Sequence, residues 1–139
     1  MAKEDYLFRQ FDLFAHVIGK VIADFIGKTS NEDVLEIDRI KEIVKSELDL
    51  DLDELFDIEN EEELTTLLLE TKKISFESLE KLVELFIEIG DKFKLQKSEN
   101  QYLIYYKKAL QLLEIISKND SVYSLKRMKV MEEVKLKIK

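Results

Sequence analysis

The feature that most constrains this chain is its near-complete lack of helix breakers. Its 139 residues include no proline and only three glycines. Proline removes a helical hydrogen bond and glycine costs backbone entropy, so a chain poor in both favours helices almost throughout. At this length one hydrophobic core is expected. We therefore predict an all-α fold, in which residues 1–139 form a single domain of about six antiparallel helices.

The first predicted helix, residues 4–26, is apolar around most of its circumference. Its polar residues form one narrow stripe at spacings of three and four: Arg9, Asp12, His16, Lys20 and Asp24. A helix with so much apolar surface lies either at the centre of a bundle or between two chains. In the second alternative the protein is a structural homodimer that associates through Phe11, Phe14 and Ile18.

The acidic segment, residues 49–63, holds nine acidic residues and no basic residue. Repulsion at that density predicts mobility. Within it, residues 49–53 (DLDLD) resemble the opening of a calcium-binding EF-hand loop. That loop needs a glycine at its sixth position and a bidentate glutamate at its twelfth, where this chain has Glu54 and Asn60. We therefore predict a solvated acidic surface without a metal site, and Asn60 as the N-cap of the next helix.

The longest amphipathic pattern is a helical hairpin, residues 75–116. Apolar residues recur at spacings of three and four from Ser75 to Phe93, which is typical of a helix with one broad apolar face. Ser75 is its predicted N-cap. After the linker 94–97, a second helix of this kind runs to about Ser117. The short linker predicts an antiparallel pair.

Part of this hairpin has a recognisable signature. Residues 86–93 (FIEIGDKF) lie on its first helix and residues 106–110 (YKKAL) on its second, with 16 positions between Phe93 and Ala109. This pattern resembles the tetratricopeptide repeat, in which a small residue such as Gly90 lets two helices approach closely while aromatic residues fill the groove.

The resemblance implies an adaptor-like domain that binds a protein or a peptide. Carried over position by position, the partner-facing residues are Glu84, Ile87, Asp91 and Lys94. A groove of this family needs stacked repeats, and only one repeat is found here. The alternative is that the protein's own first or last helix covers this face.

The last predicted helix, residues 122–138, is basic. We expect one set of residues to face inward: Tyr123, Leu125, Met128, Met131, Val134 and Ile138. We expect another set to face outward: Lys126, Arg127, Lys129, Lys135, Lys137 and Lys139. This helix is the candidate for nucleic-acid contact, but the overall net charge of −8 and the lack of aromatic residues among its lysines argue against that role.

Charge is divided along the chain. Residues 1–91 contain 10 basic and 25 acidic residues, a net charge of −15, whereas residues 92–139 contain 12 basic and 5 acidic residues, a net charge of +7. Two interpretations stay open. Either these are solvated helix faces that attract each other, or one pole of the protein contacts a charged partner.

The composition excludes most catalytic constellations. There is no cysteine and only one histidine, so neither a thiolate metal site nor a cysteine nucleophile exists. His16 with Asp12, one turn away, forms the only base-and-orienter pair, which is better explained as a surface or interface histidine. We predict no enzyme activity, no catalytic residue and no cofactor, and favour a domain that binds protein or peptide.

The start of the chain bears on location. The pattern of residues 5–10 (DYLFRQ) before an apolar helix resembles the start of small bacterial all-helical proteins with no assigned function. Charged residues interrupt the apolar run that follows, so it fits neither a secretory signal nor a bilayer span. We expect a cytoplasmic protein that does not contact a membrane.

Overall fold

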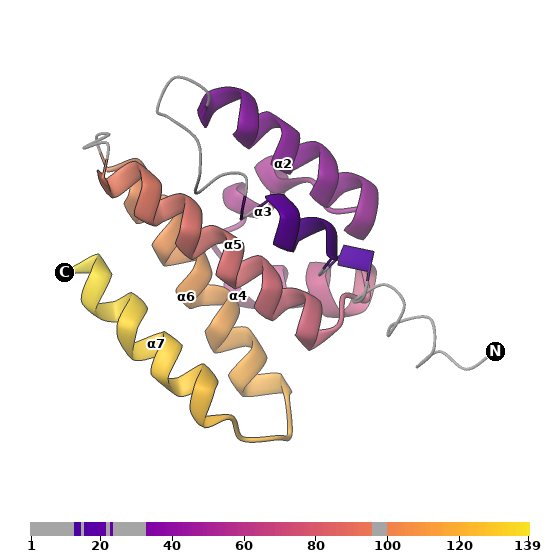
Figure 1. Cartoon of the computed structure of the whole chain (residues 1–139). Helices are drawn as coiled ribbons and strands as arrows, with labels where there is room; N and C mark the ends of the chain where they lie inside the picture. The colour runs from indigo at the N-terminus through magenta and orange to yellow at the C-terminus, as the bar shows by residue number, and fades with distance from the viewer. Residues whose placement is uncertain (1–12, 15, 22, 24–32, 96–99) are drawn as a thin grey trace. The chain divides into compact units, whose positions relative to one another are not determined.

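The computed structural model describes residues 13–14, 16–21, 23, 33–95 and 100–139 (Figure 1). Every regular element among these residues is helical, so the predicted all-α class is confirmed. The elements are α2 (Asp33–Leu48), α3 (Leu52–Asp57), α4 (Glu61–Thr65), the π-helical turn η2 (Thr66–Thr71), α5 (Phe76–Leu95), α6 (Gln101–Asn119) and α7 (Leu125–Ile138). The described residues between 13 and 23 are also helical, within the predicted first helix.

The chain divides into two compact units, Met1–Ser78 and Leu79–Lys139. The boundary falls near the start of α5, so that helix contributes its first turn to one unit and the rest to the other. The arrangement as one domain with about six antiparallel helices stays a prediction.

In the first unit, α2 buries one narrow face. Ile40, Val44 and Leu48 recur every four residues and are almost fully buried, as expected for an amphipathic helix. The helix ends at Leu48 because Asp49 takes the left-handed conformation, with φ of 54°, that commonly closes a helix. Its amide still donates to the carbonyl of Lys45 at 2.9 Å.

The acidic segment is built into two short capped helices. The Asp51 side chain accepts a hydrogen bond from the Asp53 amide at 2.9 Å and starts α3. The Asn60 side chain accepts from the Glu63 amide at 2.9 Å, so the predicted N-cap of α4 is confirmed. Three glutamates follow Asn60 in the first turn, where the helix dipole favours negative charge. The mobility expected of residues 49–63 stays a prediction.

In the second unit, α5 and α6 pack against each other through aromatic residues. The Phe93 and Tyr105 rings stack with centroids 5.7 Å apart, and Phe86 meets Tyr105 edge-on at 6.1 Å. The helices run antiparallel, since Lys94 near the end of α5 lies over the ring of Tyr102 near the start of α6. Their buried side chains include Leu82, Leu85, Phe86, Ile89, Tyr106, Ala109, Leu112, Leu113 and Ile116.

Helix α7 packs beside α6 and corrects two parts of the sequence prediction (Figure 1). Met131 and Val134 are buried, as expected. Tyr123 and Leu125, which were expected to face inward, are 72% and 68% exposed. The reason is that α7 starts at Leu125 rather than at residue 122, so Tyr123 lies in the preceding loop. At 100° per residue, Leu125 is on the side of the helix opposite Val134.

Candidate interaction surfaces

Helices α5 and α6 approach each other closely at Gly90. A Cβ atom built on Gly90 would lie 2.5 Å from Cε1 and 2.8 Å from Cδ1 of Tyr106, distances that carbon atoms do not adopt. The Tyr106 ring is fully buried. A glycine at this position therefore makes room for the aromatic ring, which is the packing expected from the sequence.

The same tyrosine belongs to a polar cluster. Its hydroxyl donates to Oδ1 of Asp91 at 2.6 Å, and Nζ of Lys137 donates to that oxygen at 2.7 Å. Burial and then the bond to Asp91 raise the pKa of Tyr106 well above its usual range, so the phenol stays protonated. Burial, followed by repulsion from Asp91 and Glu84, raises the pKa of Glu88. The cluster joins α5, α6 and α7 by paired charges and a neutral donor.

This cluster includes two of the four residues expected to face a partner. Asp91 binds Lys137 of α7, and Nζ of Lys94 donates to the Lys137 carbonyl oxygen at 3.4 Å. Glu84 is exposed and pairs with Lys81 at 3.2 Å, while Ile87 is half-buried. The protein's own last helix thus meets the C-terminal part of this face. Partner binding by the four residues stays a prediction.

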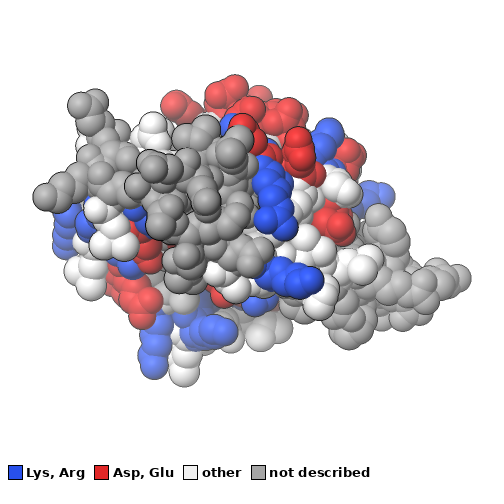
Figure 2. All heavy atoms as spheres, turned by 45° about the horizontal axis from the view of Figure 1, so that its top comes forward, with Lys and Arg blue, Asp and Glu red and all other residues white. Residues whose placement is uncertain are grey.

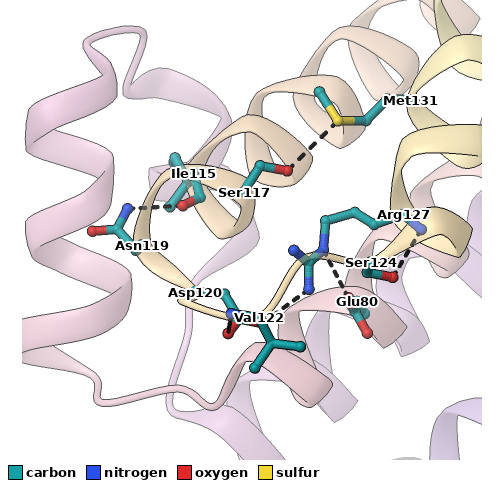
Figure 3. A network of polar contacts seen from close by, with 9 residues as sticks. All are labelled: Glu80, Ile115, Ser117, Asn119, Asp120, Val122, Ser124, Arg127 and Met131. Atoms are coloured by element: carbon teal, nitrogen blue, oxygen red, sulfur yellow. Dashed lines mark hydrogen bonds and ion pairs between the residues drawn. The ribbon is translucent and has the colours of Figure 1, made fainter.

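Arg127 also differs from its predicted placement (Figure 3). It was expected to face outward, yet its side chain is only 7% exposed. Its Nε donates to Glu80 on α5 at 3.0 Å, and its terminal nitrogen donates to Asp120 before α7 at 3.0 Å. Arg127 precedes Val134 by seven residues, which is almost two helical turns and places both on the inner side. Helical phase, rather than charge, decides which way this residue points.

Asp120 is the hub of the loop between α6 and α7. One carboxylate oxygen accepts from the Val122 amide at 3.0 Å and the other accepts from Arg127. The amide and then the guanidinium hold the pKa of Asp120 below its usual range. Ser124 caps the next helix by accepting from the Arg127 amide at 3.1 Å (Figure 3). These bonds define where α7 starts and which side of it faces inward.

With its inner side held in this way, α7 leaves a surface of apolar and charged residues in solvent. We define the outer face of α7 as Val122, Tyr123, Leu125, Lys126, Lys129, Glu132, Glu133 and Leu136. Leu136 and Val122 are 67% and 66% exposed. Lys126 and Lys129 are exposed beside Leu125. Exposed apolar residues grouped among charges are typical of an interaction site. This face was not predicted from the sequence, because Leu125 was expected to face inward.

The first unit carries a surface of the opposite charge. An acidic concavity of about 630 Å³ is lined by Asp51, Asp53, Glu54, Asp57, Ile58, Glu63, Thr66, Leu67 and Thr71. Asp51 is used as an N-cap and Asp53 pairs with Lys41 at 3.0 Å. Glu54, Asp57 and Glu63 make no ion pair with another residue that the structure describes. Acidic side chains gather along the upper edge of the face shown in Figure 2.

The aspartates of the DLDLD motif (residues 49–53) form ion pairs and a helix cap within the chain. Asp49 pairs with Lys72 at 3.3 Å and with Lys45 at 3.4 Å, and the hydrogen bond to Lys72 is the main cause that lowers the pKa of Asp49. Within the described residues, no group of histidine, cysteine, aspartate and glutamate side chains has the arrangement of a metal site.

The residues of the first helix that were predicted to mediate self-association are in part buried and in part outside the described residues. Phe14 and Ile18 are fully buried within the single chain, whereas Leu13 is exposed. His16 is exposed, and both Phe11 and Asp12 lie outside the described residues. Association through this helix stays a prediction, although burial makes Phe14 and Ile18 poor candidates for the contact.

Comparison with protein-family models, with curated proteins and with solved structures finds no match to this chain. Among the residues that the structure describes, no helix combines the length and the apolar character needed to cross a bilayer.

Proposed function

We propose that this protein is a non-enzymatic helical interaction domain that binds another protein through the outer face of α7. One observation carries the proposal. Leu125 and Leu136 are each about two-thirds exposed on a helix whose opposite side is buried. Val122 and Tyr123 extend this apolar surface into the preceding loop. Single exposed leucines are common on proteins, but several exposed apolar residues among charged ones are typical of a contact surface.

The way in which α7 is held supports the same role. The ion pairs of Arg127 hold one end of the helix, and the bond from Lys137 to Asp91 holds the other. Met131 and Val134 pack between them. A surface that is already rigid loses little conformational entropy when it binds, which favours affinity. In this proposal the tetratricopeptide-like hairpin is the scaffold that presents α7, and not itself the groove.

The test is affinity capture from a lysate of the source cells, with three forms of the protein as bait. These are the wild type, a Leu125→Glu/Leu136→Glu variant, and a Leu95→Glu control. Leu95 is a suitable control because it is exposed at the end of another helix, α5. Far-UV circular dichroism establishes that all three baits are folded.

The proposal predicts a discrete set of proteins that the wild type and the Leu95→Glu control both capture and the α7 variant loses. Two results contradict it: capture of the same proteins by all three baits, or capture by the wild type of neither a different protein nor further copies of this chain.

A further inference from the structure

The outer face of α7 has no partner within the described residues, and its chemistry limits what can cover it. Leu125 and Leu136 lie eleven residues apart on one side of the helix, and Glu132 and Glu133 are exposed between them. Lys126 and Lys129 flank the first leucine. A surface complementary to the N-terminal part of this face therefore needs carboxylates opposite Lys126 and Lys129, beside an apolar area that receives Leu125.

The acidic concavity of the first unit has this chemistry. Ile58 and Leu67 are half-buried at its surface, between the carboxylates of Glu54, Asp57 and Glu63. No described cation neutralises those three carboxylates.

The division of charge between the units supports the same pairing. Met1–Ser78 contains 9 basic and 21 acidic residues, a net charge of −12, and Leu79–Lys139 contains 13 basic and 9 acidic residues, a net charge of +4. Two copies, each with a net charge of −8, repel at long range. Attraction between copies therefore requires one orientation, in which the basic unit of one copy faces the acidic unit of the other.

We infer that the partner of the outer face of α7 is the acidic concavity of a second copy of this chain, so that the protein assembles head to tail. This inference rests on the proposed function, for which it names the partner. Such a contact uses two different surfaces, so each copy in a pair keeps one surface of each kind free. The wild type should then grow beyond a dimer as its concentration rises.

The test uses two charge-reversed variants in analytical ultracentrifugation. The acid-reversed variant is Glu54→Lys/Asp57→Lys, and the lysine-reversed variant is Lys126→Glu/Lys129→Glu. A Lys20→Glu/Lys107→Glu control makes the same change in net charge as the lysine-reversed variant, at exposed lysines outside both surfaces. Circular dichroism of each variant monitors folding.

The inference predicts that each reversed variant alone self-associates at least about tenfold more weakly than the wild type, because like charges then oppose each other at the contact. The control should associate like the wild type. An equimolar mixture of the two reversed variants should associate again in equal proportion, because the lysines of the first variant still meet the carboxylates of the second. The mixture should also grow beyond a pair, because its two reversed surfaces, lysines on one variant and glutamates on the other, again carry opposite charges.

Three results overturn the inference. The first is a wild type that stays monomeric up to about 0.5 mM, where weak contacts are still detected. The second is unchanged self-association of both the acid-reversed and the lysine-reversed variant, and the third is a mixture of these two variants that contains only monomers. If one of them occurs while capture from the lysate still depends on Leu125 and Leu136, the interaction domain stands and has another partner. If that capture also fails, the proposed function fails with the inference.

Discussion

Replacing Gly90 with alanine tests the packing of α5 against α6, because two opposing effects have calculable sizes. Alanine is favoured over glycine within a helix by about 1 kcal/mol. The new Cβ atom would lie 2.5 Å from a ring carbon of Tyr106, where carbon atoms ordinarily stay about 3.5–4.0 Å apart. The ring has little room to retreat, because it is fully buried and its hydroxyl is bound to Asp91 at 2.6 Å.

Overpacking of this kind lowers the free energy of unfolding by about 1–3 kcal/mol. Subtracting the propensity gain, Gly90→Ala should lower it by about 0–2 kcal/mol. Gly19 supplies the control, since a Cβ atom there meets nothing within 4 Å and the residue is helical. Gly19→Ala should raise the free energy of unfolding by up to about 1 kcal/mol. The two substitutions should therefore have opposite signs, or differ by at least about 1 kcal/mol.

The assay is urea unfolding followed by circular dichroism at 222 nm, with the dependence on urea concentration compared among variants. A Tyr106→Leu background removes the ring, and in that background Gly90→Ala should become stabilising like Gly19→Ala. If Gly90→Ala raises stability as much as Gly19→Ala in the otherwise unchanged chain, the reasoning about this contact is refuted.

Three further predictions concern the polar contacts of α7 and α6. Arg127→Met should lower the free energy of unfolding in urea, because it removes the ion pairs to Glu80 and Asp120. The same change at exposed Lys126 should alter the free energy of unfolding by less than about 0.5 kcal/mol, and equal effects of the two changes would contradict the network. Because the folded-state pKa of Asp120 is lowered, its ionised form contributes stability above the unfolded pKa of about 4 that is lost as the pH falls through the folded value. Asp120→Asn should therefore make acid unfolding less steep below about pH 4, and unchanged steepness would argue against the shift. Because the pKa of Tyr106 is raised, this tyrosine should ionise last when the pH is increased, as followed by tyrosinate absorbance at 295 nm. Tyr106→Phe should therefore abolish the last rise in absorbance. If that rise is still present in the variant, it belongs to another tyrosine.

Much of the local structure follows from the sequence, because helix propensity and capping depend on neighbouring residues. The absence of proline predicted the helical class, and Ser75 and Asn60 cap the helices they were expected to start. The spacing of Gly90 and the aromatic residues predicted the close contact of α5 and α6. In each of these cases the deciding interactions span a few residues or one hairpin.

The errors arose where packing between separate segments decided the outcome. Ser124 starts α7 three residues later than the apolar pattern suggested, and the helical phase then turns Leu125 outward and Arg127 inward. Burying an arginine is unfavourable unless carboxylates meet it. Glu80 lies 47 positions away along the chain, so no local pattern could reveal that it pairs with Arg127.

The sequence by itself thus determined that the chain is helical, that Asn60 and Ser75 start helices, and that charge is divided along its length. Only the tertiary structure decided which side of α7 meets solvent, and that α7 contacts the face of α5 carrying Asp91 and Lys94. The physical reason is that propensity and capping act within a few residues. The direction in which a side chain points is set instead by partners that folding brings from distant segments.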